Sequence, residues 1–189
     1  MKIAIMTAWN TEDSSALHSQ ALVAEWMKLG HKVTVFSFFR EDYNSHQFTG
    51  TDGREVVRCF SRNGFLDPRP ILTTDFDIFI VENLRTLPME ELAKIYSLIK
   101  SRSRTIHIVY EHKLPEKNEF YQFLWDKVVY YDNRQEFLKS VYPDARFIPF
   151  PSQKSEECKS EAEQVFATMN SADKIAQLYI DLFIEVLRK

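Results

Sequence analysis

A histidine flanked by charged residues follows one of the apolar runs of this chain. Glu111, His112 and Lys113 come directly after the run TIHIVY. A histidine at the end of a strand can act as a general base, or as an imidazolium that stabilises negative charge, because its pKa is easily tuned across neutrality. His112 is therefore the catalytic candidate, with Glu111 beside it. The alternative is a partly exposed loop histidine without a role.

The segment after the first apolar run carries a second group of polar side chains. Its sequence is AWNTEDSSALHS, with no glycine. A dinucleotide site would show G-x-G-x-x-G here, and a P-loop would show GK[ST]. The carboxylates of Glu12 and Asp13 would occupy the positive end of a helix and repel a phosphate. A hydroxyl-rich ligand such as a carbohydrate is expected instead, and a simple helix cap is the alternative. The candidate contacts are Trp9, Asn10, Thr11, Glu12, Ser14 and Ser15.

Glu82 and Asn83 end another apolar run and are predicted to point into the same crevice. A polar cap on the end of the strand is the competing explanation. His107 lies inside a predicted strand and is expected to be a core residue, while His18 and His46 have no partners at metal-ligand spacing. The sequence therefore predicts no metal site and no bound cofactor.

The composition is that of an ordinary globular protein. The chain has 189 residues, 44% of them hydrophobic, and a formal net charge of −3. No basic field is present, so nucleic acid is not an expected partner. Cys59 and Cys158 lie far apart in the sequence, without disulfide or metal spacing, as expected of a reducing cytoplasm. No apolar run has signal-peptide character or approaches the ~20 residues of a membrane span, so a soluble, cytoplasmic protein is expected.

Strand and helix patterns alternate along the chain. The runs without alternation, such as KIAIMT and DIFIVE, are typical of strands covered on both faces. The pattern predicts a doubly wound α/β fold with a mostly parallel sheet. Strands are expected at 2–7, 31–39, 55–60, 77–82, 105–110, 127–131 and 146–150, and helices at 13–29, 88–99, near 120–124 and at 134–141.

The character of the sequence changes after Pro151. Residues 1–151 are predicted to form one domain, and residues 152–170 are polar, as in a linker or an exposed helix. Residues 171–189 form an amphipathic helix with an apolar stripe that includes Ile175, Leu182 and Val186.

Four phrases of the sequence resemble the amino-terminal half of retaining glycosyltransferases of the two-Rossmann (GT-B) architecture, the family of sucrose synthase and the mannosyltransferases. They are MKIAIMTAW followed by LGHKVTVFS, then DIFIVEN, IHIVYEH, and a closing unit that ends in IPFP. The resemblance covers residues 1–151 and implies a Rossmann-like domain on the acceptor side of the enzyme. It matches His112 to the family's active-site histidine and the Trp9–Ser15 loop to its acceptor-contacting loop.

The chain departs from the family in two respects. The first loop lacks the usual glycine pair, and the donor-binding domain with its E-x7-E signature is missing after Pro151. The last helix resembles the family's final helix, which returns to pack on the first domain. The resemblance thus implies an acceptor-binding half that needs a separate donor-binding chain, with a glycan or glycolipid as its acceptor.

Half a cleft neither excludes water nor positions two substrates, so the isolated chain is expected to be inactive. Two alternatives stay open: a non-catalytic binding or regulatory module of this fold, or an unrelated doubly wound domain that binds a nucleotide or flavin. The uncovered donor-facing surface could also support a homo-oligomer.

Overall fold

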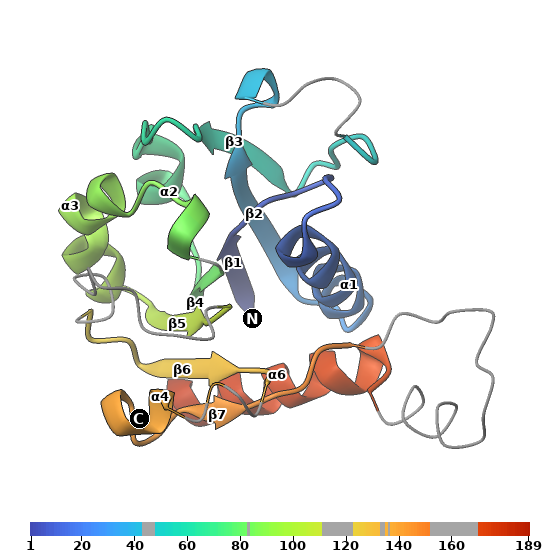
Figure 1. The fold of residues 1–189 in the computed structure, drawn as a ribbon, viewed down its shortest axis with the longest axis vertical. Coiled ribbons are helices and arrows are strands. Elements are labelled where there is room, and N and C mark those ends of the chain that lie inside the picture. Colours follow the sequence, from blue (N-terminus) through green and yellow to red (C-terminus); the bar gives the residue numbers. More distant parts are fainter. Residues whose placement is uncertain (43–47, 83, 111–122, 133–134, 136, 152–169) are drawn as a thin grey trace.

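The computed structural model describes residues 1–42, 48–82, 84–110, 123–132, 135, 137–151 and 170–189. Its centre is a seven-stranded sheet in the order β3-β2-β1-β4-β5-β6-β7, and every neighbouring pair is parallel. The order reverses between the central strand β4 and its neighbour β1. Figure 1 shows the twisted sheet with helices on both sides. The predicted doubly wound α/β fold is confirmed.

The strands lie close to where the apolar runs predict them. They are β1 (Lys2–Met6), β2 (Lys32–Phe38), β3 (Val56–Phe60), β4 (Ile78–Glu82), β5 (Arg104–Ile108), β6 (Lys127–Tyr130) and β7 (Arg146–Phe147). In the central register Ile3 pairs with Val33 on one side and with Ile78 on the other. This register brings the carboxyl ends of β1 and β4 side by side.

The helices form the two outer layers. They are α1 (Ser14–Lys28), α2 (Arg69–Thr73), α3 (Met89–Lys100), α4 (Leu138–Val141) and α6 (Ala172–Leu187), with short 3-10 turns η1 (Arg40–Asp42) and η3 (Leu84–Thr86). Successive side chains of β1 alternate between the layers because a strand repeats every two residues. Ile3 and Ile5 pack with residues of α1 and α6, while Ala4 and Met6 pack with residues of α2, α3 and α4.

The carboxyl-terminal helix α6 packs back on the domain. Its partner is Trp26 of α1, whose indole Nε1–H donates to the Ala176 carbonyl at 3.3 Å. The Trp26 ring also meets Tyr179 and Phe183 edge-on, at centroid distances of 5.9 and 5.4 Å. Burial of such aromatic side chains stabilises a domain strongly. The prediction that the final helix returns to the first domain is therefore confirmed.

Helix α1 ends in a Schellman motif. The Gly30 N–H donates to the Met27 carbonyl and the His31 N–H to the Trp26 carbonyl, both at 3.0 Å. Gly30 has φ +82°, a left-handed conformation that glycine adopts without a Cβ penalty. Gly30 is thus the residue directly after the helix C-cap, Leu29.

Strand β7 is shorter than predicted. It was expected to reach Phe150 but ends at Phe147, because Pro149 has no N–H to continue the ladder. The helix expected at 134–141 is described only in part: residues 134 and 136 lie outside the described residues, and α4 covers Leu138–Val141. Just before it, the Gln135 side chain accepts from the Tyr131 and Asp132 amides and fixes a turn.

Most of the aromatic helix predicted near 120–124 lies outside the described residues, and Leu124 itself is not helical. Within the described chain, no helix combines the length and the apolar character that crossing a membrane requires.

Candidate functional site

A buried carboxylate stands where the strand order reverses. Glu82 is the last residue of β4, and its side chain is fully buried. Four donors converge on its two oxygens. They are the Thr7 hydroxyl at 3.1 Å, the Tyr110 hydroxyl at 2.6 Å, the His18 Nδ1–H and the Ser19 hydroxyl. A carboxylate buried away from water requires such partners, and here every lone-pair direction has one.

Three elements position these donors. Thr7 follows β1, whose register sets Met6 opposite Val81, so that Thr7 comes next to Glu82. Tyr110 follows β5, the strand that pairs with β4 on its other side. The carboxyl ends of adjacent parallel strands thus meet at one edge, which is where open α/β sheets bind ligands.

Helix α1 supplies the other two donors from above the sheet. His18, Leu22 and Trp26 lie four residues apart and therefore share one face of the helix. All three are buried against the sheet and α6. His18 thereby occupies the amino-terminal end of an otherwise apolar stripe, and Ser19 beside it donates to the same carboxylate.

Tyr110 serves as a hydrogen-bond donor in this network. Burial, followed by the charge of Glu82, raises the pKa of Tyr110 well above its usual value. Tyr179 of α6 is fully buried, and burial together with the Glu82 charge likewise raises its pKa well above the usual value. Both phenols therefore keep their protons over the physiological range.

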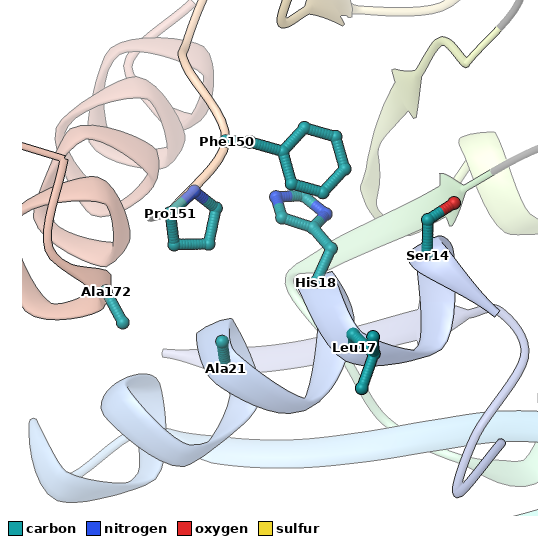
Figure 2. A pocket seen from close by; sticks show the side chains of 7 residues that line it. All are labelled: Ser14, Leu17, His18, Ala21, Phe150, Pro151 and Ala172. Atoms are coloured by element: carbon teal, nitrogen blue, oxygen red, sulfur yellow. The ribbon is translucent and has the colours of Figure 1, made fainter. Parts of the chain in front are cut away.

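A cavity of about 340 Å³ opens next to His18 (Figure 2). Its lining combines one imidazole and one hydroxyl with small apolar side chains and an aromatic ring: Ser14, Leu17, His18, Ala21, Phe150, Pro151 and Ala172. Figure 2 shows the imidazole projecting from α1 toward Phe150 and Pro151. The His18 and Phe150 ring centroids are 4.4 Å apart, and their planes are inclined by 46°.

The cavity has the chemistry of a neutral-ligand site. Its volume is near the lower end of the range for small-molecule pockets, about 300–1,000 Å³. No Lys or Arg is found among the described residues that line it, and a buried carboxylate lies beneath its histidine. An apolar wall with few polar groups suits a ring that carries hydroxyls, whereas a phosphate would meet the field of Glu82 with no cation in this described lining to balance it.

Two of the predicted site residues border this region. Ser14 begins α1 and lines the cavity, and Glu82 holds His18 from below. Ser15 is buried inside the first turn of α1, and Glu12 is exposed. Of the residues that the sequence singled out, Ser14 and Glu82 thus lie at or next to the cavity. The sequence did not indicate that His18 lies between them.

The other predicted loop residues turn away from the cavity. Trp9 is buried in the core on the α1 side of the sheet. The Asn10 amide donates to Asp52 at 2.9 Å, and its carbonyl accepts from Gln20 at 2.6 Å. Asn10 has φ 55°, a left-handed conformation that asparagine tolerates. Thr11 is buried and forms an antiparallel bridge with Phe48.

The carboxylate of Asp52 fixes this loop. Arg58 donates to both Asp52 oxygens, at 2.7 and 2.8 Å, and Arg40 donates at 3.1 Å. Hydrogen bonding to Arg58 holds the pKa of Asp52 far below its usual range. Both guanidinium groups also lie over the Phe48 ring. This cluster is internally satisfied and ties the β1–α1 loop to the segment before β3.

Three predicted site residues, Asn83, Glu111 and His112, lie outside the described residues. His107 is fully buried in β5, as predicted for a core histidine, and burial lowers its pKa to about 3.

His18 is the cavity-lining residue that the sequence analysis did not single out. The available signal was its position four residues before Leu22, which extends the buried stripe of α1 and directs the imidazole toward the end of β4.

Within the part of the chain that the structure describes, no three His, Cys, Asp or Glu side chains gather as metal ligands would. No model of a known protein family matches the chain.

Proposed function

We propose that this chain is the acceptor-binding half of a glycosyltransferase-like protein, which binds a neutral, hydroxyl-rich acceptor and depends on a separate chain to hold the nucleotide sugar. The observation that carries the proposal is the position of the cavity. It lies between the first turns of α1, the segment Phe150–Pro151 that follows β7, and Ala172 at the start of α6. In the two-domain architecture that the sequence resembles, these last two segments are the crossings to and from the second domain. The cavity therefore faces the side on which a donor domain would lie.

The charges around the crevice favour an acceptor over a nucleotide. Glu82 already buries a negative charge beside the first turns of α1, where a dinucleotide-binding fold would receive its pyrophosphate. The β1–α1 loop has no glycine to let a phosphate approach the backbone, and Asp13 stands at the N-cap. These features count against the alternative of a nucleotide- or flavin-binding domain.

The isolated chain is proposed to bind without catalysing transfer. Only residues 152–170 separate Pro151 from Ser171, too few for a second Rossmann domain. Transfer needs the donor sugar to be held against the acceptor in a site closed to water. One domain supplies only one wall of such a site.

The test is a ligand panel measured by saturation-transfer NMR and thermal shift. Neutral methyl glycosides and short glycans are expected to receive saturation from the protein, whereas UDP-, GDP- and ADP-sugars and FMN are not. Incubation of the chain with both a donor and an acceptor should yield no transferred sugar. Binding of a nucleotide or flavin without binding of any glycan would refute the proposal.

A further inference from the structure

We propose that the His18 Nε2 atom is the hydrogen-bonding contact for one hydroxyl of a single neutral pyranose ring bound in the cavity, and that Glu82 is the residue that aims it. This inference rests on the proposed function and deepens it, because it names the class of ligand and the atom that recognises it.

The two nitrogens of His18 have different surroundings. Nδ1 is committed to the Glu82 carboxylate inside the protein. Nε2 lies on the other side of the ring, and the structure gives it no hydrogen-bond partner among the described residues. His18 also lines the cavity, toward which its ring projects from α1 (Figure 2). Nε2 is therefore the imidazole atom placed to reach a ligand.

The lining selects the size and polarity of that ligand. About 340 Å³ accommodates one ring rather than a chain of sugars or a dinucleotide. Phe150 and Pro151 form one wall, Leu17 and Ala21 another, and these apolar groups match the C–H face of a pyranose. Ser14 is the second polar residue among the described lining residues and can contact another hydroxyl.

A hydroxyl is the complementary partner for Nε2 because it can both donate and accept. A carboxylate or phosphate ligand would instead lie close to the Glu82 charge, with no Lys or Arg among the lining residues that the structure describes to offset it. The same site thereby discriminates against anionic ligands.

Glu82 acts through His18 and not on the ligand. Its carboxylate fixes the orientation of the imidazole, while Thr7, Ser19 and Tyr110 hold the carboxylate in turn. A carboxylate on the far nitrogen is the arrangement that presents the near nitrogen of a histidine in a defined tautomer and orientation. Glu82 is therefore a positioning residue.

Two substitutions of His18 test the roles of Nδ1 and Nε2 individually. Asparagine places its amide N–H near the position of Nδ1, so His18→Asn keeps the donor to Glu82 and removes the atom that reaches the cavity. Glutamine is longer, so His18→Gln places its amide near the position of Nε2. His31→Asn is the matched control. His31 directly precedes β2 and therefore lies at the amino ends of the strands, whereas the cavity lies near their carboxyl ends.

The experiment is a titration of the full chain with methyl α-D-mannopyranoside and methyl α-D-glucopyranoside, followed through the ¹⁵N resonances of labelled histidine rings. The sugar is expected to shift His18 Nε2 and to leave His31 unchanged. His18→Asn should weaken binding about tenfold or more, as the loss of one desolvated hydrogen bond implies. His18→Gln should retain part of the affinity, and His31→Asn all of it.

A second signature tests the positioning role of Glu82. In the wild type the ¹⁵N shifts of His18 should report one fixed hydrogen-bonding state for Nδ1. In Glu82→Gln they should change, and sugar affinity should fall although Glu82 does not touch the ligand. Unchanged His18 shifts in Glu82→Gln would overturn the positioning role.

The outcomes distinguish this inference from the proposed function. If a sugar binds but His18 Nε2 does not respond, and His18→Asn binds as well as the wild type, the inference fails and the proposed function stands. If neither sugar binds and UDP-glucose or FMN does, both fail. If none of these probes binds, both fail as well.

Discussion

Replacement of Glu82 by glutamine should destabilise the fold measurably. The substitution conserves the shape of a fully buried side chain while it removes the charge that four donors share. Hydrogen bonds to a charged group contribute about 1.5–3 kcal/mol, against about 0.5–1.5 kcal/mol for neutral pairs. Glutamine also replaces one accepting oxygen by an NH₂ group, which cannot accept.

The expected loss follows from these contacts. The Thr7 and Ser19 hydroxyls can rotate to accept from the new amide, and Ser19 can still donate to Thr7, but both hydroxyls lose the carboxylate oxygen as an acceptor and the remaining bonds become weaker. Removal of the charge also relieves part of its desolvation cost. The net decrease in the free energy of unfolding should be about 2–3 kcal/mol, or about 4–12 °C in Tm for a domain of this size.

The assay is urea denaturation at constant pH, with Glu12→Gln as the control. Glu12 is an exposed carboxylate in the neighbouring loop, and its substitution should change stability by less than about 0.5 kcal/mol. A double-mutant cycle between Glu82→Gln and Tyr110→Phe should give a coupling of about 1 kcal/mol. Equal stability of Glu82→Gln and Glu12→Gln, or a coupling of zero, would refute the proposed role of the network.

Three further predictions concern other parts of the molecule. Gly30→Ala should lower the free energy of unfolding by about 1 kcal/mol, because an added Cβ meets no neighbouring atom but strains a backbone at φ +82°. Gly30→Asn should lower it less, since asparagine tolerates this conformation better. Equal losses for the two variants would contradict this explanation. Asp52→Asn should cost about 1–3 kcal/mol in denaturant unfolding, since Arg58 and Arg40 lose a charged acceptor, while Asp67→Asn should cost less because its partner Arg69 is 85% exposed and Arg58 only 11%. Because burial lowers the pKa of His107 to about 3, the contribution of this residue to the free energy of unfolding is fully present above about pH 6.5. It is lost as the pH falls toward about 3, since the unfolded chain then binds a proton that the folded chain excludes. His107→Phe should flatten that acid branch of the stability curve, and an unchanged slope would contradict the cause assigned to the shift.

The arrangement of the core was predictable because short apolar runs carry most of the information for a parallel sheet. KIAIMT and DIFIVE lack alternation, and their strands β1 and β4 are covered on both faces. The start and end of α1 were also predictable, since Asp13 stands at its N-cap and Gly30 follows its C-cap. The edge strand β7 was less predictable, because it is limited by a proline rather than by hydrophobic periodicity.

The candidate site was only partly predictable, for a different reason. The position of Glu82 follows from the end of a buried run, but its four donors come from three separate segments of the chain. Proximity of that kind depends on register and on the rotation of α1, neither of which a single sequence specifies. Trp9, Asn10 and Thr11 have suitable chemistry, yet Trp9 is buried in the core and Asn10 contacts Asp52.

The most direct test of the account is a map of backbone amide shifts on addition of methyl α-D-mannopyranoside and, separately, of UDP-glucose. The cavity beside His18 predicts that the neutral sugar shifts the amides of Leu17 and Ala21 on α1 and of Ala172 on α6, two elements that are distant in sequence and both line the cavity. UDP-glucose should leave them unchanged. Shifts induced by UDP-glucose at the β1–α1 loop, with none induced by the sugar around the cavity, would contradict the account.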